Sequence, residues 1–234
     1  MIGTLVNTAS ILVGGFLGVL LGAKLKDNLK QTVVSGLGLF TLAYAVSLFL
    51  ETQNALIVLG SVVIGILLGE WWRIEDGLTW LGIRLEAKFN NGNGGATGSA
   101  RFIKGFLTST MLFVIGPMAI LGSIQDGLSG DFNTLLIKSV LDGFTAMAFA
   151  STLGVGVMFS AIPVFLYQGS ITLLAQQVQK FATPDMMNEL SATGGVILAG
   201  LAISSILEIK KIRVGNFLPA LLIAPLIVFI LSLI

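Results

Sequence analysis

The sequence predicts an all-α fold, a polytopic bundle of about eight transmembrane helices in which some helices are broken or re-entrant. Of the 234 residues, 55% are hydrophobic and 11% are charged, whereas an ordinary soluble domain carries about 25% charged residues. The uncharged runs are long enough to cross a bilayer, because a hydrocarbon core of about 30 Å needs roughly 20 apolar residues in a helix. The few charges cluster between these runs. The lipid bilayer is therefore the predicted main partner.

The composition also excludes most enzyme chemistry. The chain has no Cys and no His, which removes disulfides, thiolate nucleophiles, histidine-based triads and the usual zinc ligands. The formal net charge of +1 gives no field that would attract nucleic acid. We therefore expect no enzymatic activity, no cofactor, no metal site and no nucleic-acid partner.

Six spans follow directly from runs with few charges: 4–22, 32–50, 55–72, 106–124, 190–207 and 216–234. A longer stretch begins near Leu135, has no charged residue between Asp142 and Lys180, and is too long for one span. Pro163 lies near its middle, and proline removes a helical hydrogen bond and disfavours helix in the preceding residue. We predict two helices that meet at 160–163. Whether 160–179 is a full span or a re-entrant helix stays open.

The distribution of Lys and Arg predicts the orientation, because cytoplasmic loops collect positive charges. With eight spans and an extracytoplasmic N-terminus, 11 of the 13 Lys and Arg residues lie on the cytoplasmic side, and only Lys138 and Lys180 lie outside. One kinked span in place of the two that meet near Pro163 would give 9 inside and 4 outside. Both termini are therefore predicted to be extracytoplasmic.

The chain is predicted to divide into two halves. Residues 1–89 form an N-terminal half of three spans and a helix over 74–89, whose apolar residues recur at helical spacing as in a helix lying in the headgroup plane. Residues 90–100 are rich in Gly, Asn, Ser and Thr, a composition typical of a flexible linker. Residues 101–234 form a C-terminal half with about five spans.

Glycine seams predict where helices approach one another closely. In the first span Gly14, Gly18 and Gly22 recur every four residues, and Asn7 lies on the same face. Small residues at this spacing allow close packing of membrane helices. The motif does not say whose helix it meets, so packing within the chain and a homodimer through the glycine-rich helices both stay open.

An inverted repeat is a further prediction. A shift of 158 residues lays 32–50 on 190–208, and it matches Gly36 with Gly194 and Ser47 with Ser205. Under the predicted topology the matched spans run in opposite directions, as in many transporters. Chance similarity between two apolar helices is the alternative interpretation.

Polar residues inside the apolar runs are the candidate site. An ionised side chain at the bilayer centre costs at least ~2.5 kcal/mol, so Asp142 indicates either a functional carboxylate or one paired near the surface with Lys138, one turn earlier. Asn7, Asp142, Tyr167 and Gln168 are predicted to line one polar cavity between the two halves. The second half is predicted to contribute Ser191, Thr193 and Asn216 to it. The candidate substrate-binding residues are Asn7, Gln125, Asp142, Tyr167, Gln168, Ser191, Thr193 and Asn216.

Several strings in the chain resemble the YqgA-type family of bacterial membrane proteins, a domain of unknown function. The strings that carry the resemblance are 116–127 (Gly-Pro-Met-Ala-Ile-Leu-Gly-Ser-Ile-Gln-Asp-Gly), 138–143, 160–163, 167–169 and 212–216. The match spans nearly the whole chain. It implies a multi-pass protein of the bacterial cytoplasmic (inner) membrane and gives no residue a role.

The leading functional hypothesis is a transporter or channel for a small polar solute or ion. Its basis is the number of polar groups beside broken helices, together with the predicted repeat. The alternative is a non-transporting membrane scaffold or regulatory subunit, in which the same groups only lock the bundle by interhelical hydrogen bonds. Because such bonds average well under ~1 kcal/mol each, a purely structural need for so many is weak.

Overall fold

The computed structural model describes residues 1–89, 95–179 and 182–233, and every regular element in these ranges is a helix. Within these ranges seven helical stretches are long and apolar enough to cross a membrane, and the number rises to eight if one bent pair of helices counts as a single span. The prediction of an all-α polytopic bundle is confirmed. The main helices are α1 (Ile2–Gly22), α2 (Asp27–Phe49), α3 (Ala55–Trp72), α4 (Ile74–Phe89), α5 (Gly95–Val114), α6 (Pro117–Ser129), α7 (Asn133–Leu153), α9 (Ala161–Leu173), α11 (Pro184–Leu201) and α12 (Ala220–Leu231).

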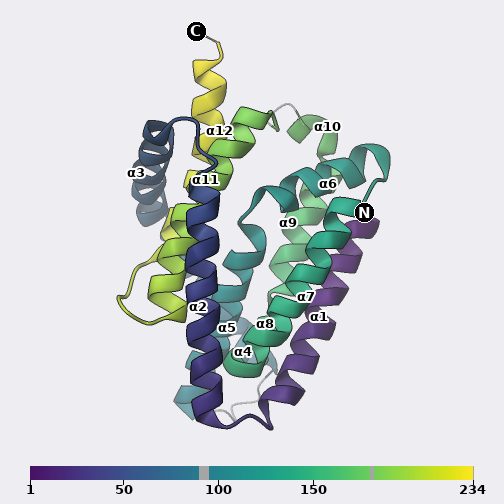
Figure 1. Cartoon of the computed structure of the whole chain (residues 1–234), viewed down its shortest axis with the longest axis vertical. Helices are drawn as coiled ribbons and strands as arrows, with labels where there is room; N and C mark the ends of the chain where they lie inside the picture. The colour runs from purple at the N-terminus through teal and green to yellow at the C-terminus, as the bar shows by residue number, and fades with distance from the viewer. Residues whose placement is uncertain (90–94, 180–181, 234) are drawn as a thin grey trace.

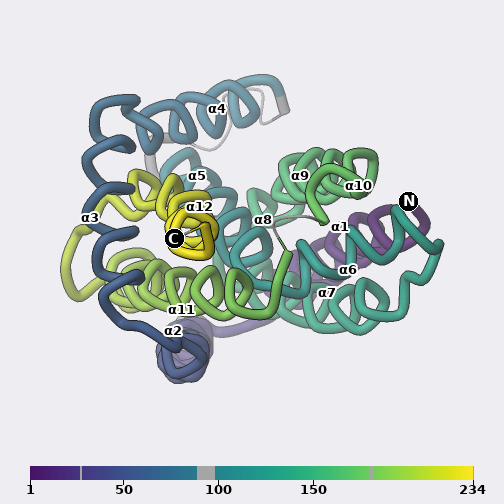
Figure 2. Tube along the Cα trace, turned by 90° about the horizontal axis from the view of Figure 1, so that it is seen from above, coloured from purple at the N-terminus to yellow at the C-terminus, as the bar shows by residue number. Residues whose placement is uncertain are grey.

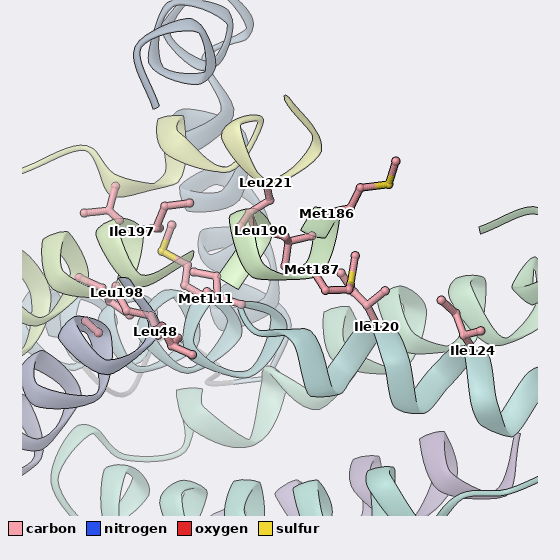
Figure 3. Packing of buried hydrophobic residues seen from close by; sticks show 14 residues of the cluster. Leu48, Met111, Ile120, Ile124, Met186, Met187, Leu190, Ile197, Leu198 and Leu221 are labelled. Atoms are coloured by element: carbon pink, nitrogen blue, oxygen red, sulfur yellow. The ribbon is translucent and has the colours of Figure 1, made fainter. Parts of the chain in front are cut away.

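The spanning helices form two groups on either side of α5. Helices α1, α6, α7 and α9 pack together on one side, and α2, α3, α11 and α12 on the other, as the view from above shows (Figure 2). An apolar cluster that includes Leu48, Met111, Met187 and Leu198 fills the space where α2, α5, α6 and α11 meet (Figure 3). The outward faces carry exposed large apolar side chains such as Phe16. This distribution is the one that a surrounding hydrocarbon phase requires.

Helices α1 and α7 pack side by side along their length (Figure 1). A Cβ atom added at Gly14, Gly18 or Gly22 would overlap the carbonyl oxygens of Gly143, Met147 and Ser151 respectively. The glycine seam therefore packs within the chain, and any homodimer contact would need another face. Because the contacting residue numbers rise together, the two helices run parallel.

The parallel direction of α1 and α7 determines how the chain crosses. Two parallel spans must be separated by an odd number of crossings, and α2 and α3 supply only two. The bent pair α5–α6, which is long and apolar enough for one span, is the candidate for the third crossing. With the bent pair counted as one span, the chain has eight candidate spans, and α1 and α12 have their outer ends on the same side of the bundle.

The remaining pairs agree with this path. Thr4 and Asn7 of α1 contact Thr172 and Gln168 of α9, so α9 runs antiparallel to α1. Gly195 of α11 lies against Ala45 of α2, and these two helices are antiparallel as well.

Two breaks differ from the sequence prediction. The span at 106–124, predicted as a simple helix, bends by 63° between α5 and α6. Gly116 stands there with φ 135°, a conformation that favours glycine, and Pro117 lacks an N–H group but fits the first turn of α6.

Two helices do meet at Ser160, within the predicted 160–163 region, but the chain reverses earlier than predicted. The chain reverses at Gly154, which has φ 82°, and α8 (Gly156–Phe159) follows; only Ser160 separates α8 from α9. Pro163 lies in the first turn of α9, where its missing N–H breaks no intrahelical bond. Residues 156–173 form a span by length and composition.

The structure describes only the second part of the predicted linker at 90–100. Residues 95–100 are helical and begin α5, and Ser99 Oγ donates to Glu86 Oε1 of α4 at 2.8 Å. Residues 90–94 lie outside the described residues. The two predicted halves are interleaved, since α1 of the first packs on α7 of the second. The helix predicted over 74–89 is present as α4.

Candidate functional site

An ion pair is buried halfway along α7. Asp142 lies nine residues after Asn133, the first residue of the 21-residue helix, so it is about 14 Å along the axis at 1.5 Å per residue. Lys138 Nζ lies 2.9 Å from Asp142 Oδ1 and 2.6 Å from Oδ2. Both side chains are only 9% exposed. Pairing with Lys138 is thus confirmed, but it occurs deep in the bundle and not near the surface.

Two amides complete what we call the polar cluster, which consists of Asn7, Lys138, Asp142 and Gln168. Asn7 Nδ2 donates to Asp142 Oδ2 at 3.0 Å and to Gln168 Oε1 at 3.2 Å. The close approach at the glycine seam brings Asn7 to Asp142, because both residues lie on the facing surfaces of α1 and α7. Both amides are fully buried. Asn7 Oδ1 and Gln168 Nε2 have no hydrogen-bond partner among the described residues.

A cavity of about 350 Å³ lies beside the ion pair, between α2, the α5–α6 bend and α7. Lys138 and Asp142 are the charged residues that line it. Phe113 and Phe149 contribute to an otherwise largely apolar wall. The ion pair is therefore both buried and in contact with space that a small molecule can occupy.

The bend between α5 and α6 forms one end of this cavity. Gly116, Pro117, Met118 and Ala119 line it, and α6 begins at Pro117 without a side-chain cap. The N–H groups in the first turn of a helix have no intrahelical acceptor and carry partial positive charge. The end of α6 thus adds hydrogen-bond donors to the cavity.

Three of the predicted site residues, Asn7, Asp142 and Gln168, come together in the polar cluster. Tyr167 does not join it, because adjacent helical residues point about 100° apart; it packs on the apolar cluster of Met187 instead. Gln125 lies near the end of α6, where its Oε1 accepts from Thr134 Oγ1 at 2.6 Å.

The second-half residues also lie apart from the polar cluster. Ser191 Oγ donates to Met187 O within its own helix at 2.8 Å. Thr193 is fully buried on α11, and its hydroxyl has no partner among the described residues. Asn216 is at the opposite end of the bundle, where its Oδ1 accepts from the Glu75 N–H at 2.8 Å. The single cavity predicted for all these residues is not formed, and their part in binding stays a prediction.

A second cavity of about 450 Å³ opens at the end opposite the termini, between α4, α5 and the segment after α11. Its wall includes Glu75, Lys104, Thr108 and Ser204. Burial raises the pKa of the Glu75 carboxyl, while the hydrogen bond from the Gly215 N–H opposes the shift. Thr108 is not among the predicted site residues, although Thr108, Ser109 and Thr110 stand together in an apolar run just before Gly116-Pro117.

Not every buried carboxylate belongs to a cavity. Glu189 of α11 is 2% exposed and accepts from Thr52 Oγ1 at 2.7 Å, from the Gln53 N–H at 2.8 Å and from the Asn54 N–H at 3.0 Å. These bonds tie the loop between α2 and α3 to α11. A structural role therefore explains why the Glu189 carboxylate is buried. Asp142 ties down no such loop, so its burial is not explained in this way.

The fold and the polar cluster define an α-helical polytopic membrane protein with an ion pair and a cavity at its centre. The chain belongs to the family described as "Protein of unknown function (DUF554)", which matches residues 2–229. The resemblance to YqgA-type proteins is confirmed.

Two relatives cover almost the whole chain. "Uncharacterized membrane protein YdfK" of Bacillus subtilis (strain 168) is 32% identical over 235 residues, which are 99% of this chain and 97% of the relative. "Uncharacterized protein YqgA" of Escherichia coli (strain K12) is 32% identical over 224 residues, 96% of this chain and 94% of the relative. No solved structure matches the chain. The name of the Bacillus subtilis relative, which calls it a membrane protein, and the apolar helices of this chain together support location in a membrane.

Proposed function

We propose that this protein carries a small polar solute or ion across the bacterial cytoplasmic membrane, with the polar cluster at its binding site. The observation that carries the proposal is the Lys138–Asp142 pair, which is buried at mid-depth and lines a cavity. Ionised groups at this depth are costly and mark solute pathways by default. Packing alone does not account for the pair, because well-packed apolar residues of similar volume are often equally or more stable in its place.

The arrangement of α5 supports a carrier. Met111 lines the second cavity and Leu112 lines the cavity beside the ion pair, so a single helix lies between the two spaces. This helix ends at the 63° bend at Gly116. Discontinuous helices next to a mid-membrane site are typical of secondary transporters. The proposal includes the inverted repeat, in support of which α2 and α11, the helices matched by the shift, pack antiparallel.

The proposed orientation places both termini outside and the end rich in Lys and Arg in the cytoplasm. Because the chain has no Cys, one introduced thiol reports one position. A cysteine at Ser99, in the first turns of α5, should react only with reagents that reach the cytoplasm. A cysteine at Ser129, the exposed last residue of α6 at the end where the termini lie, should react from outside intact cells. Labelling in the reverse pattern would overturn the orientation.

Transport is tested by pairing ligand response with a charge-free variant. The full-length protein in detergent is screened for solutes and ions that raise its melting temperature, since a ligand of the folded state stabilises it by mass action. The double variant Lys138→Met/Asp142→Asn should fold and lose that response, and wild-type proteoliposomes should take up the solute found. A response that is unchanged in the double variant would contradict the proposal.

The alternative, a scaffold or regulatory subunit, is favoured by the bonds of Asn7, which join α1 to α7 and α9. It predicts that no solute stabilises the wild-type protein. It also predicts that replacing the pair changes only the melting temperature. The same screen therefore separates the two functions.

A further inference from the structure

We propose that the solute is a small zwitterion with an apolar body, of the amino-acid class, bound in the cavity between α2, the α5–α6 bend and α7. This inference rests on the proposed transport function and names its substrate class. It follows from the hydrogen-bonding capacity of the ion pair, the charge balance of the cavity and the chemistry of the remaining wall.

The ion pair retains one donor and one acceptor. A lysine ammonium has three N–H donors, and a carboxylate offers about four lone-pair sites. Lys138 Nζ contacts both oxygens of Asp142, and Asn7 Nδ2 donates to Oδ2. By this count one ammonium N–H and one carboxylate lone pair remain, and both residues line the cavity. A ligand that presents a carboxylate next to an ammonium group complements both.

Charge balance favours the same ligand. Lys138 and Asp142 neutralise each other, so a bound anion or cation would leave a net charge buried in the bundle, at an effective cost of several kcal/mol. A zwitterion adds no net charge. Its carboxylate fits between Lys138 and the uncapped N-terminus of α6, where Met118 and Ala119 line the cavity, and its ammonium group fits against Asp142.

The rest of the cavity determines the body of the ligand. Leu37, Phe40, Phe113, Phe144 and Phe149 form much of the wall, and its uncharged polar side chains are the hydroxyl-bearing Thr41, Tyr44 and Thr145. Because apolar side chains predominate, the wall favours a ligand with an apolar body. A volume of about 350 Å³ falls in the range of small-molecule sites, roughly 300–1,000 Å³. An amino acid with an aliphatic or aromatic side chain meets both conditions.

The experiment compares four compounds that share a phenyl body. L-phenylalanine is the zwitterion, phenethylamine the cation, 3-phenylpropionate the anion and 2-phenylethanol the neutral molecule. In thermal-shift titrations of the full-length wild-type protein, we expect L-phenylalanine to raise the melting temperature. Each of the other three should need at least about tenfold higher concentration for the same shift, which corresponds to about 1.4 kcal/mol.

Variants that fill the cavity test the location without touching the ion pair. Ala148→Leu adds volume from α7, and Leu37→Trp narrows the same cavity from α2. Whichever of the two folds should lose the response to L-phenylalanine. Ala43→Leu adds the same volume as Ala148→Leu at an exposed position of α2 and should keep it.

The outcomes separate this inference from the proposed function. An equal response to the anion or the cation would overturn the zwitterion class while leaving transport standing. The zwitterion class would also be overturned if inorganic ions, and none of the phenyl compounds, raised the melting temperature in a way that depends on Asp142. If Ala148→Leu or Leu37→Trp kept the full response to L-phenylalanine, the location of the site in this cavity would be overturned. No response to these compounds or to any solute of the wider screen would overturn both proposals.

Discussion

Single removal of either charge in the polar cluster is expected to destabilise the protein strongly. Lys138→Met leaves the Asp142 carboxylate buried without its cation, and Asp142→Asn leaves the Lys138 ammonium without its anion. Removing one partner of a buried ion pair costs about 3–5 kcal/mol. Because both side chains are only 9% exposed, contact with water compensates only a small part of the lost interaction. We expect each single variant to show a clear fall in the free energy of unfolding.

The double variant Lys138→Met/Asp142→Asn should regain most of this loss. It leaves no uncompensated charge, and replacing an ion pair by neutral groups of similar size is often neutral or stabilising. The free energies of unfolding of the wild type, the two singles and the double form a cycle whose coupling term should be at least about 2 kcal/mol. Lys24→Met, at an exposed position, is the control and should stay within about 0.5 kcal/mol of wild type. Losses that simply add in the double variant would show that the pair is not coupled.

Gly18→Val is expected to damage the seam between α1 and α7. A Cβ atom at Gly18 would overlap the carbonyl oxygen of Met147 and lie 2.9 Å from the Cβ of Ala150. Backbone atoms cannot move aside as a flexible side chain does, so α1 would have to retreat. That shift would also pull Asn7 away from Asp142. Overpacking of this kind costs typically 1–3 kcal/mol, and here we expect at least about 2 kcal/mol.

The matched control is Gly36→Ala on α2, where an added Cβ meets nothing within 4 Å. Glycine within a helix is less stable than alanine by roughly 0.5–1 kcal/mol, so this variant should melt at the same temperature as the wild type or slightly higher. Melting temperatures of both variants in one detergent are the measurement. Equal stability of Gly18→Val and the wild type would mean that the seam tolerates a wider separation than its geometry indicates.

The positions of the spans could be predicted from the sequence, because an uncharged run of sufficient length is a local property. The breaks could not. Pro163 looked like a helix end, yet proline at the first turn of α9 is tolerated. Gly154 is one of 29 glycines, and nothing local marks it as one that adopts positive φ. Gly116 precedes Pro117, a pair typical of turns, but the pair does not determine the 63° angle of the bend. The conformation at Gly154 depends on the packing of α8 on α5, and the conformation at Gly116 depends on the angle between α5 and α6. Neither is a local property of the sequence.

The candidate site divides in the same way. Asn7 and Asp142 could be found because polar groups inside apolar runs are few, and the glycine spacing shows which face of α1 is buried. Pairing of Asp142 with Lys138 near the surface was one of two interpretations left open, because the depth of the pair depends on where α7 begins. Asn216 could not be placed, since its partner Glu75 is 141 residues away in sequence and belongs to a helix that does not cross.

The contact between Asn7 and Asp142 can form only late in the synthesis of the protein. The two residues are 135 positions apart, so α1 is synthesised and inserted long before α7 exists. Residues 1–23 carry no charged side chain, which allows α1 to wait in the bilayer alone, with its glycine face and one amide exposed to lipid. Its final neighbours, α7 and α9, arrive only when most of the chain has left the ribosome. Assembly of the centre is therefore a late event in biogenesis, and a chain arrested before α9 would leave the amide of Asn7 without Gln168.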